Sequence, residues 1–119
     1  MNPETWEKID ALIDKNQSVT LRDYFANDLK RAEKFSLEAA GWFLDYSKNR
    51  IDEEMMAALV ELAEKANLKA EIEKMFTGEK INATEGRAVL HTALRNVEPD
   101  ARVFVDGKDV MPDVRAVLK

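Results

Sequence analysis

Residues 52–78 read DEEMMAALVELAEKANLKAEIEKMFTG, and the spacing of their apolar side chains predicts two successive helices. Asp52 opens the first helix, which carries one apolar stripe made of Met55, Leu59, Leu62 and Ala66. Asn67 interrupts the pattern, and the second helix ends at Gly78, because glycine suits the left-handed position that follows a helix. This stretch therefore indicates a mainly helical fold.

Two more helical segments are predicted upstream of this stretch. Pro3 fits the first turn of a helix that runs to about Asn16. Ser18 or Thr20 can cap a second segment, which we expect to end near Phe35. The apolar side chains at helical spacing in these two segments are Trp6, Ile9, Leu12, Ile13, Leu21, Tyr24, Phe25 and Leu29.

Downstream of residue 78 the helical pattern returns twice. Thr84 could cap a helix that ends before Pro99, although Gly86 weakens that helix by roughly 1 kcal/mol relative to alanine. Pro112 suits the first turn of a final helix through Leu118. The residues expected on the buried side of the helix after Thr84 are Leu90, Ala93, Leu94 and Val97.

Two short stretches have the aromatic and β-branched composition of strands. One is residues 42–46, bounded by Gly41, and the other is residues 102–106, followed by a turn at Gly107. We expect these strands to be neighbours in one small sheet. The predicted fold class is α+β, mainly helical with two short strands.

Composition narrows the classes of function. The chain has 119 residues, 45% of them hydrophobic and 34% charged, with a formal net charge of −5. An acidic balance argues against a nucleic-acid or anionic-membrane partner, since both need a basic surface. There are no cysteines and one histidine, which leaves little basis for a thiolate or zinc site. We expect a soluble, cytoplasmic, single structural unit.

The single histidine is the first candidate for a binding site. On the helix predicted after Thr84, His91 stands in a row with Arg87 and Arg95 at i, i+4 spacing. Three such side chains could hold a phosphate. The alternative is that the arginines form ion pairs and the histidine packs at a boundary, which we favour because no glycine-rich cradle accompanies the row.

Acidic residues and one lysine are further candidates. Asp52, Glu53 and Glu54 could serve as acid and base, but they lie at a helix start, where the helix dipole already favours carboxylates. Lys80 could belong to a site, or could be a solvated loop lysine, which is the interpretation we prefer. We therefore assign no catalytic, cofactor-binding or metal-binding residue.

Three stretches of the sequence indicate a protein family, which the periodicity does not. LDYSKNRI occupies residues 44–51, GEKINATEGRAVLHTALRN residues 78–96, and VDGKDVMPDVRAVL residues 105–118. In this order they resemble blocks of the glucose-6-phosphate isomerase (phosphoglucose isomerase) family. Residues 42–119 carry the resemblance, whereas 1–41 match only as a variable helical lead-in. The link VEPDAR departs from the family's more usual asparagine-rich spacer.

The resemblance implies the N-terminal segment of an α/β sugar-isomerase (SIS-type) enzyme, with 1–119 as a single N-terminal unit. Such enzymes interconvert glucose 6-phosphate and fructose 6-phosphate in glycolysis and gluconeogenesis. They open the sugar ring and then move a proton between C2 and C1 through a cis-enediolate. A glutamate base, a histidine, a lysine, an arginine and a Ser/Thr-rich phosphate loop do this without a cofactor, in a homodimer.

In the family, these catalytic positions follow the VDGKDVMP block, so we expect the chain to end before them and to be inactive alone. The final helix agrees with this expectation, since it ends on apolar Val117 and Leu118 without a cap. Two alternatives stay open. One is a stand-alone helical interaction module with the isomerase N-terminal fold. The other is a sugar-phosphate-binding regulator that uses Arg87, His91 and Arg95.

Overall fold

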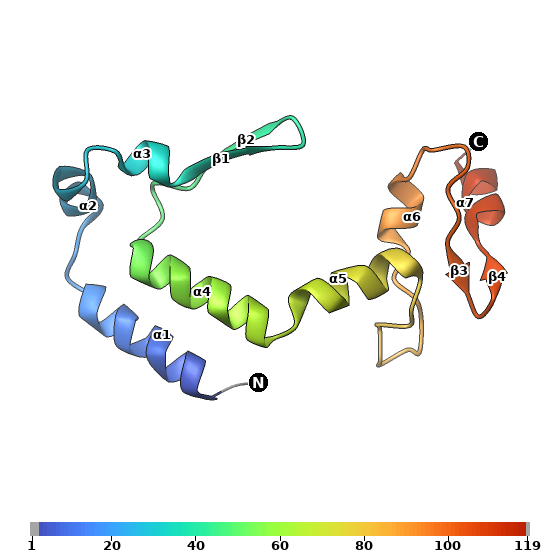
Figure 1. Cartoon of the computed structure of the whole chain (residues 1–119), viewed down its shortest axis with the longest axis horizontal. Helices are drawn as coiled ribbons and strands as arrows, with labels where there is room; N and C mark the ends of the chain where they lie inside the picture. The colour runs from blue at the N-terminus through green and yellow to red at the C-terminus, as the bar shows by residue number, and fades with distance from the viewer. Residues whose placement is uncertain (1–2, 119) are drawn as a thin grey trace. The chain divides into compact units, whose positions relative to one another are not determined.

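The computed structural model describes residues 3–118 and groups them into two compact units, one up to Ala66 and one from Asn67 (Figure 1). The first unit contains α1 (Pro3–Asn16), α2 (Leu21–Asn27), α3 (Arg31–Lys34), β1 (Ser36–Ala39), β2 (Trp42–Asp45) and α4 (Glu53–Lys65). The second contains α5 (Leu68–Thr77), α6 (His91–Arg95), β3 (Phe104–Val105), β4 (Lys108–Asp109) and α7 (Met111–Val117). The predicted class, α+β and mainly helical, is confirmed. No helix within residues 3–118 has the length and apolar character needed to span a bilayer.

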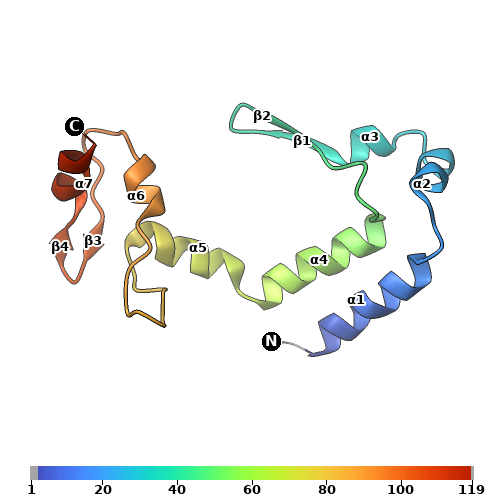
Figure 2. The same cartoon turned by 180° about the vertical axis from the view of Figure 1, so that it is seen from behind.

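The core of the first unit lies between α1 and α4, which run side by side in both views (Figures 1 and 2). The pair is antiparallel, because Lys8 meets Glu61 near one end and Asn16 donates to Asp52 near the other. The buried side chains between the two helices are Ile9, Leu12, Met55 and Ala58, with Ile51 and Leu62 partly buried against them. Leu59, predicted on the same stripe as Met55, is instead exposed.

The segment expected to be one helix from residue 20 to about 35 is two helices, so that prediction was wrong in its continuity. Thr20 caps α2 as predicted, in a reciprocal capping box with Asp23. The helix then stops because Asp28 turns the chain, and its Oδ1 accepts a hydrogen bond from the backbone N–H of Lys30 at 3.0 Å. Leu29, expected on the apolar face, falls in that turn and is 93% exposed.

The two predicted strands exist but are not neighbours, which corrects the expectation of one sheet. Each pairs with an adjacent segment instead, β2 with β1 and β3 with β4, in two separate antiparallel hairpins. Both hairpins close through two-residue turns whose central residues have positive φ. Gly107 allowed the second turn to be predicted from the sequence. In the first turn, Ala40 precedes Gly41 and has a φ of 51°, although alanine is uncommon at positive φ.

The second unit is built around a small core next to the β3–β4 hairpin. Its buried residues are Ala93, Val103, Met111 and Val114. Pro112 lies in the first turn of α7, as predicted. Arg115 fastens α7 to the loop before β3, since its Nη2 donates to the carbonyls of Glu98 and Ala101 at 3.2 and 2.9 Å.

The helix expected from Thr84 to about residue 97 is much shorter than predicted, and only α6 is helical. The reason is a closed turn between Asn82 and Arg87, whose backbones exchange hydrogen bonds of 3.1 and 3.2 Å. Within it, the Asn82 side chain bonds Glu85, and Gly86 takes a left-handed φ of 64°. A turn that satisfies its own polar groups competes with the helix at this position.

Gly78 ends α5 as predicted, and the structure adds a reason why this residue is glycine. Its φ is +85°, and a Cβ added here would lie 2.6 Å from the carbonyl oxygen of Phe104. Gly107, at φ +78°, would meet nothing within 4 Å. The first glycine therefore combines a left-handed backbone with a close approach of α5 to the hairpin, and the second has only the backbone requirement.

We expect Gly78→Ala to destabilise the second unit more than Gly107→Ala does. The control substitution should lower the free energy of unfolding by about 1–2 kcal/mol through left-handed strain alone. The clash at Gly78 should add about 1–3 kcal/mol. Urea unfolding followed by circular dichroism measures both, and equal losses in the two variants would contradict the close approach.

A second prediction concerns acid and the α1–α4 pair. Hydrogen bonds and charges from Lys65 and Lys8 lower the pKa of Glu61 from 4.5 to about 2. A carboxylate with a lower pKa in the folded state stabilises that state above about pH 4.5, and the stabilisation disappears as the pH falls towards 2. Glu61→Gln should therefore flatten the loss of stability over this window. Urea unfolding at pH 7, 4 and 3 tests it, with Glu64→Gln on the same helix as control, and equal pH slopes in both variants would refute it.

Candidate functional site

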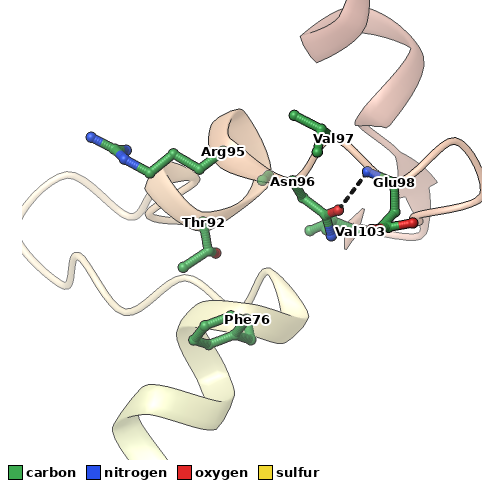
Figure 3. Close-up of a pocket in the computed structure, with 8 residues that line it drawn as sticks. Phe76, Thr92, Arg95, Asn96, Val97, Glu98 and Val103 are labelled. Carbon is green, nitrogen blue, oxygen red and sulfur yellow. Dashed lines mark hydrogen bonds between the residues drawn. The ribbon is translucent and has the colours of Figure 1, made fainter. Parts of the chain in front are cut away.

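A groove in the second unit is a candidate binding site (Figure 3). It is lined by Phe76, Thr92, Ala93, Arg95, Asn96, Val97, Glu98 and Val103. The chain after α6 bends around it, held by the Asn96 side-chain oxygen, which accepts a hydrogen bond from the N–H of Glu98 at 3.1 Å. The ring of Phe76 and the side chains of Val97 and Val103 make much of its surface apolar.

The guanidinium of Arg95, one of the charged groups that line this groove, is engaged within its own helix. Arg95 extends away from Val97 and Val103 in Figure 3, and its Nη1 donates to the carbonyl of His91 at 2.9 Å. The guanidinium therefore closes the last turn of its own helix. What the groove offers is an apolar surface with an amide at its rim, which suits an apolar side chain of another segment.

The row of Arg87, His91 and Arg95 does not form. His91 is the first residue of α6, and Arg95 is the last, so these two share a helix. Arg87 lies outside it, bridged to Asn82 in the closed turn. All three side chains are exposed. The helical stacking on which a three-residue phosphate site depended is therefore absent from this part of the structure.

The three carboxylates at the start of α4 each have a partner in the structure. Asp52 caps the helix, accepting from the N–H of Met55 at 2.8 Å. Glu53 pairs with Lys34, and Glu54 pairs with Lys15. Each bridges α4 to another helix of the first unit, so these acidic groups serve packing between helices. No cluster of three or more metal-ligating side chains occurs among residues 3–118.

Lys80 lies in the connecting loop before the closed turn and is exposed, as expected. Its Nζ also forms an ion pair of 2.7 Å with Asp106 at the tip of the β3–β4 hairpin. This pair adds a polar contact to the close approach at Gly78, and both join the end of α5 to the hairpin.

A buried ionisable group, Arg31, was not identified from sequence. Arg31, on α3, is 2% exposed and sits over the rings of Tyr24 and Phe35, at 4.6 and 4.5 Å from their centroids. Its Nε donates to the carbonyl of Ser47 at 2.7 Å. Its Nη2 donates to the carbonyls of Asn49 and Ile51, both at 2.8 Å. The ring of Phe25 lies farther away, with its centroid 5.7 Å from the guanidinium carbon, so three loop carbonyls and three aromatic rings surround one buried charge.

A second arginine connects the same loop to the chain that follows α1. Arg50 belongs to the loop that Arg31 holds, and its Nη2 donates to the carbonyls of Gln17 and Val19 at 2.9 and 3.0 Å. The segment LDYSKNRI therefore receives hydrogen bonds from α3 and gives them to the chain that leaves α1. The signal for this in the sequence was an arginine amid Tyr24, Phe25 and Phe35, which periodicity alone had placed on an ordinary helix.

The sequence of the chain matches a family of known proteins. The family model described as "Phosphoglucose isomerase" matches residues 45–119. The chain is 51% identical over 114 residues to the glucose-6-phosphate isomerase of Alteromonas mediterranea, covering 96% of the chain and 21% of that relative. It is 58% identical over 99 residues to glucose-6-phosphate isomerase 1 of Chromobacterium violaceum, covering 83% of the chain and 18% of the relative. The glucose-6-phosphate isomerase of Gloeobacter violaceus is 50% identical over 113 residues, which is 95% of the chain and 20% of that relative.

The chain thus spans about a fifth of the length of the curated relatives it matches. The matched range includes the closed turn, the groove and most of the loop held by Arg31. That none of the chain's residues is catalytic stays a prediction.

We expect Arg31→Lys to destabilise the first unit by about 2–4 kcal/mol, because one ammonium on a flexible stem cannot donate to three carbonyls in this fixed arrangement. Urea unfolding measures the loss. Arg22→Lys, an exposed arginine on α2, is the matched control and should change the free energy of unfolding by less than about 0.5 kcal/mol. Losses that agree in the two variants would show that Arg31 does not hold the loop.

Proposed function

We propose that the chain, which belongs to the phosphoglucose isomerase family, is the N-terminal portion of a glucose-6-phosphate isomerase. The observation that carries the proposal is the 51% identity over 96% of the chain to a relative of that name, of which the chain covers 21%. The family match over residues 45–119 also supports it.

The whole protein, on this proposal, interconverts glucose 6-phosphate and fructose 6-phosphate in glycolysis and gluconeogenesis. The sugar ring opens, and a proton moves between C2 and C1 through a cis-enediolate. A positioned base contributes about 10²–10⁴-fold to such a transfer, and fixed cations stabilise the oxyanion that develops. We place this enzyme in the cytoplasm as a homodimer, without a metal or organic cofactor.

Within that enzyme we assign residues 1–119 to one N-terminal portion, with residues 1–41 as its variable lead-in and the catalytic α/β domains outside it. Its contribution is structural support. The polar groups that the sequence singled out support this view, because Asp52 caps α4 and Lys80 pairs with Asp106. Arg31, Arg50 and Arg115 likewise donate hydrogen bonds to loop carbonyls and hold backbone.

The 119-residue chain alone should show no turnover of fructose 6-phosphate in an assay coupled to glucose-6-phosphate dehydrogenase. A chimera in which this chain replaces the matching segment of the Alteromonas mediterranea relative should be active, within about tenfold of that relative, because a tenfold change corresponds to only about 1.4 kcal/mol in the barrier.

Two results would overturn the proposal. Turnover by the isolated chain at the relative's rate would place catalytic residues within 1–119. A chimera that folds, as judged by its circular dichroism and its elution as a single species, but shows no turnover would mean that the chain does not serve as the N-terminal portion of this enzyme. The relative itself is the positive control.

A further inference from the structure

The β1–β2 hairpin has two faces of different character, and the register of its strands defines them. Leu37 lies opposite Leu44, and Ala39 lies opposite Trp42. Because side chains alternate across a strand, these two pairs point to the same side of the hairpin. That side, which we call the apolar face, consists of Leu37, Ala39, Trp42 and Leu44.

The other face is mostly polar. Ser36 lies opposite Asp45, and Glu38 lies opposite Phe43. Two carboxylates and a hydroxyl on one side favour contact with water there, since a buried charge without a partner is costly. Phe43 is the exception on this polar face. The division of character predicts which side of the hairpin is buried against another surface and which side is not.

The apolar face is exposed in the structure. Trp42 is 79% exposed and Leu44 is 53% exposed, and in Figures 1 and 2 the hairpin projects from α3. A two-stranded hairpin by itself is marginally stable in water. An apolar ribbon of this kind, including a tryptophan, indicates a surface that packs against something else.

The base of the hairpin is fixed, so the apolar face has a defined direction relative to α3. The rings of Phe35 and Tyr46 meet edge to face with centroids 5.7 Å apart, and the N–H of Tyr46 donates to the carbonyl of Phe35 at 2.9 Å. Arg31 holds the next residue along, through the carbonyl of Ser47. A rigid base reduces the conformational entropy that docking of the hairpin would lose.

We propose that the apolar face docks onto the remainder of the same polypeptide, the part of the isomerase outside residues 1–119. This rests on the proposed function, in which the chain is one portion of a longer enzyme. The area of the apolar face favours this occupant over a separate molecule. One tryptophan and two leucines offer a few hundred Å², at roughly 150–250 Å² for an aromatic side chain. A stable interface between separate molecules buries about 800 Å² per partner.

A small apolar face is adequate when its partner is covalently attached. Attachment replaces a bimolecular association with an intramolecular one, at an effective concentration in the millimolar range. The curated relatives provide such a partner in cis, because about four fifths of their length lies outside the match. The receiving surface is apolar and has room for an indole ring, while Glu38 and Asp45 stay in water.

Hydrogen exchange with mass spectrometry tests this on the peptide that covers residues 36–45. The exchange of its amides is compared between the 119-residue chain and the chimera with the Alteromonas mediterranea relative. Docking should slow exchange of this peptide at least tenfold in the chimera. The peptide that covers α4 (Glu53–Lys65) serves as the folding control, because its protection should remain in both proteins.

A matched pair of variants assigns the effect to one face. Leu44→Ser in the chimera should remove most of the added protection, since Leu44 lies on the apolar face. Phe43→Ser, at the neighbouring position on the polar face and 65% exposed, should retain it. Both variants place the same residue in the same strand, so a general weakening of the hairpin would affect them alike.

The proposal is overturned if the peptide exchanges equally fast in the chimera and in the isolated chain, or if Phe43→Ser abolishes the protection as Leu44→Ser does. Protection in the isolated chain that rises with its concentration would overturn it in favour of a second copy as occupant. Turnover is read separately: an active chimera with an unprotected hairpin refutes docking alone, and a protected hairpin without turnover refutes the proposed function alone.

Discussion

The guanidinium of Arg31, buried beneath aromatic rings and bonded to three carbonyls of one loop, is the contact on which the first unit depends. Loop carbonyls without a partner would destabilise any buried arrangement, and a single planar group with several donors satisfies them together. The loop in turn leads directly into Asp52, the cap of α4, and its Arg50 holds the chain after α1. One buried charge thus connects the hairpin, the loop and the helix pair.

Hydrogen bonds from arginines to loop carbonyls support two units whose apolar cores are small and whose surfaces carry large apolar side chains. Each unit buries only a few apolar side chains, and polar contacts between arginines and loop carbonyls do much of the remaining work, including Arg115 in the second unit. Large apolar residues such as Trp42 and Phe76 stay on the outside. On the proposed function, this exposed apolar surface faces the rest of the enzyme.

Local chemistry determined how far the sequence could predict the fold. Where a cap or a glycine settles the backbone, prediction succeeded, as at Thr20, Asp52, Gly78 and Pro112. It failed where side chains satisfy a backbone turn within a helical pattern, as Asp28 and Asn82 do. Strand β1 was not predicted, because alanine adopts positive φ at the turn that joins it to β2. Arg31 was not identified because its partners are backbone carbonyls, which every residue type carries. Family membership came from three blocks, and neither composition nor periodicity could supply it.

On the proposed function, this chain supports an active site without contributing a residue to it. A crystal structure of the chimera with fructose 6-phosphate bound tests that claim most directly. We expect no side chain of residues 3–118 to lie within hydrogen-bonding distance of the sugar phosphate, and we expect Trp42, now 79% exposed, to be buried against the rest of the polypeptide. An arginine or histidine of this chain on the phosphate, or a Trp42 still in solvent, would contradict it.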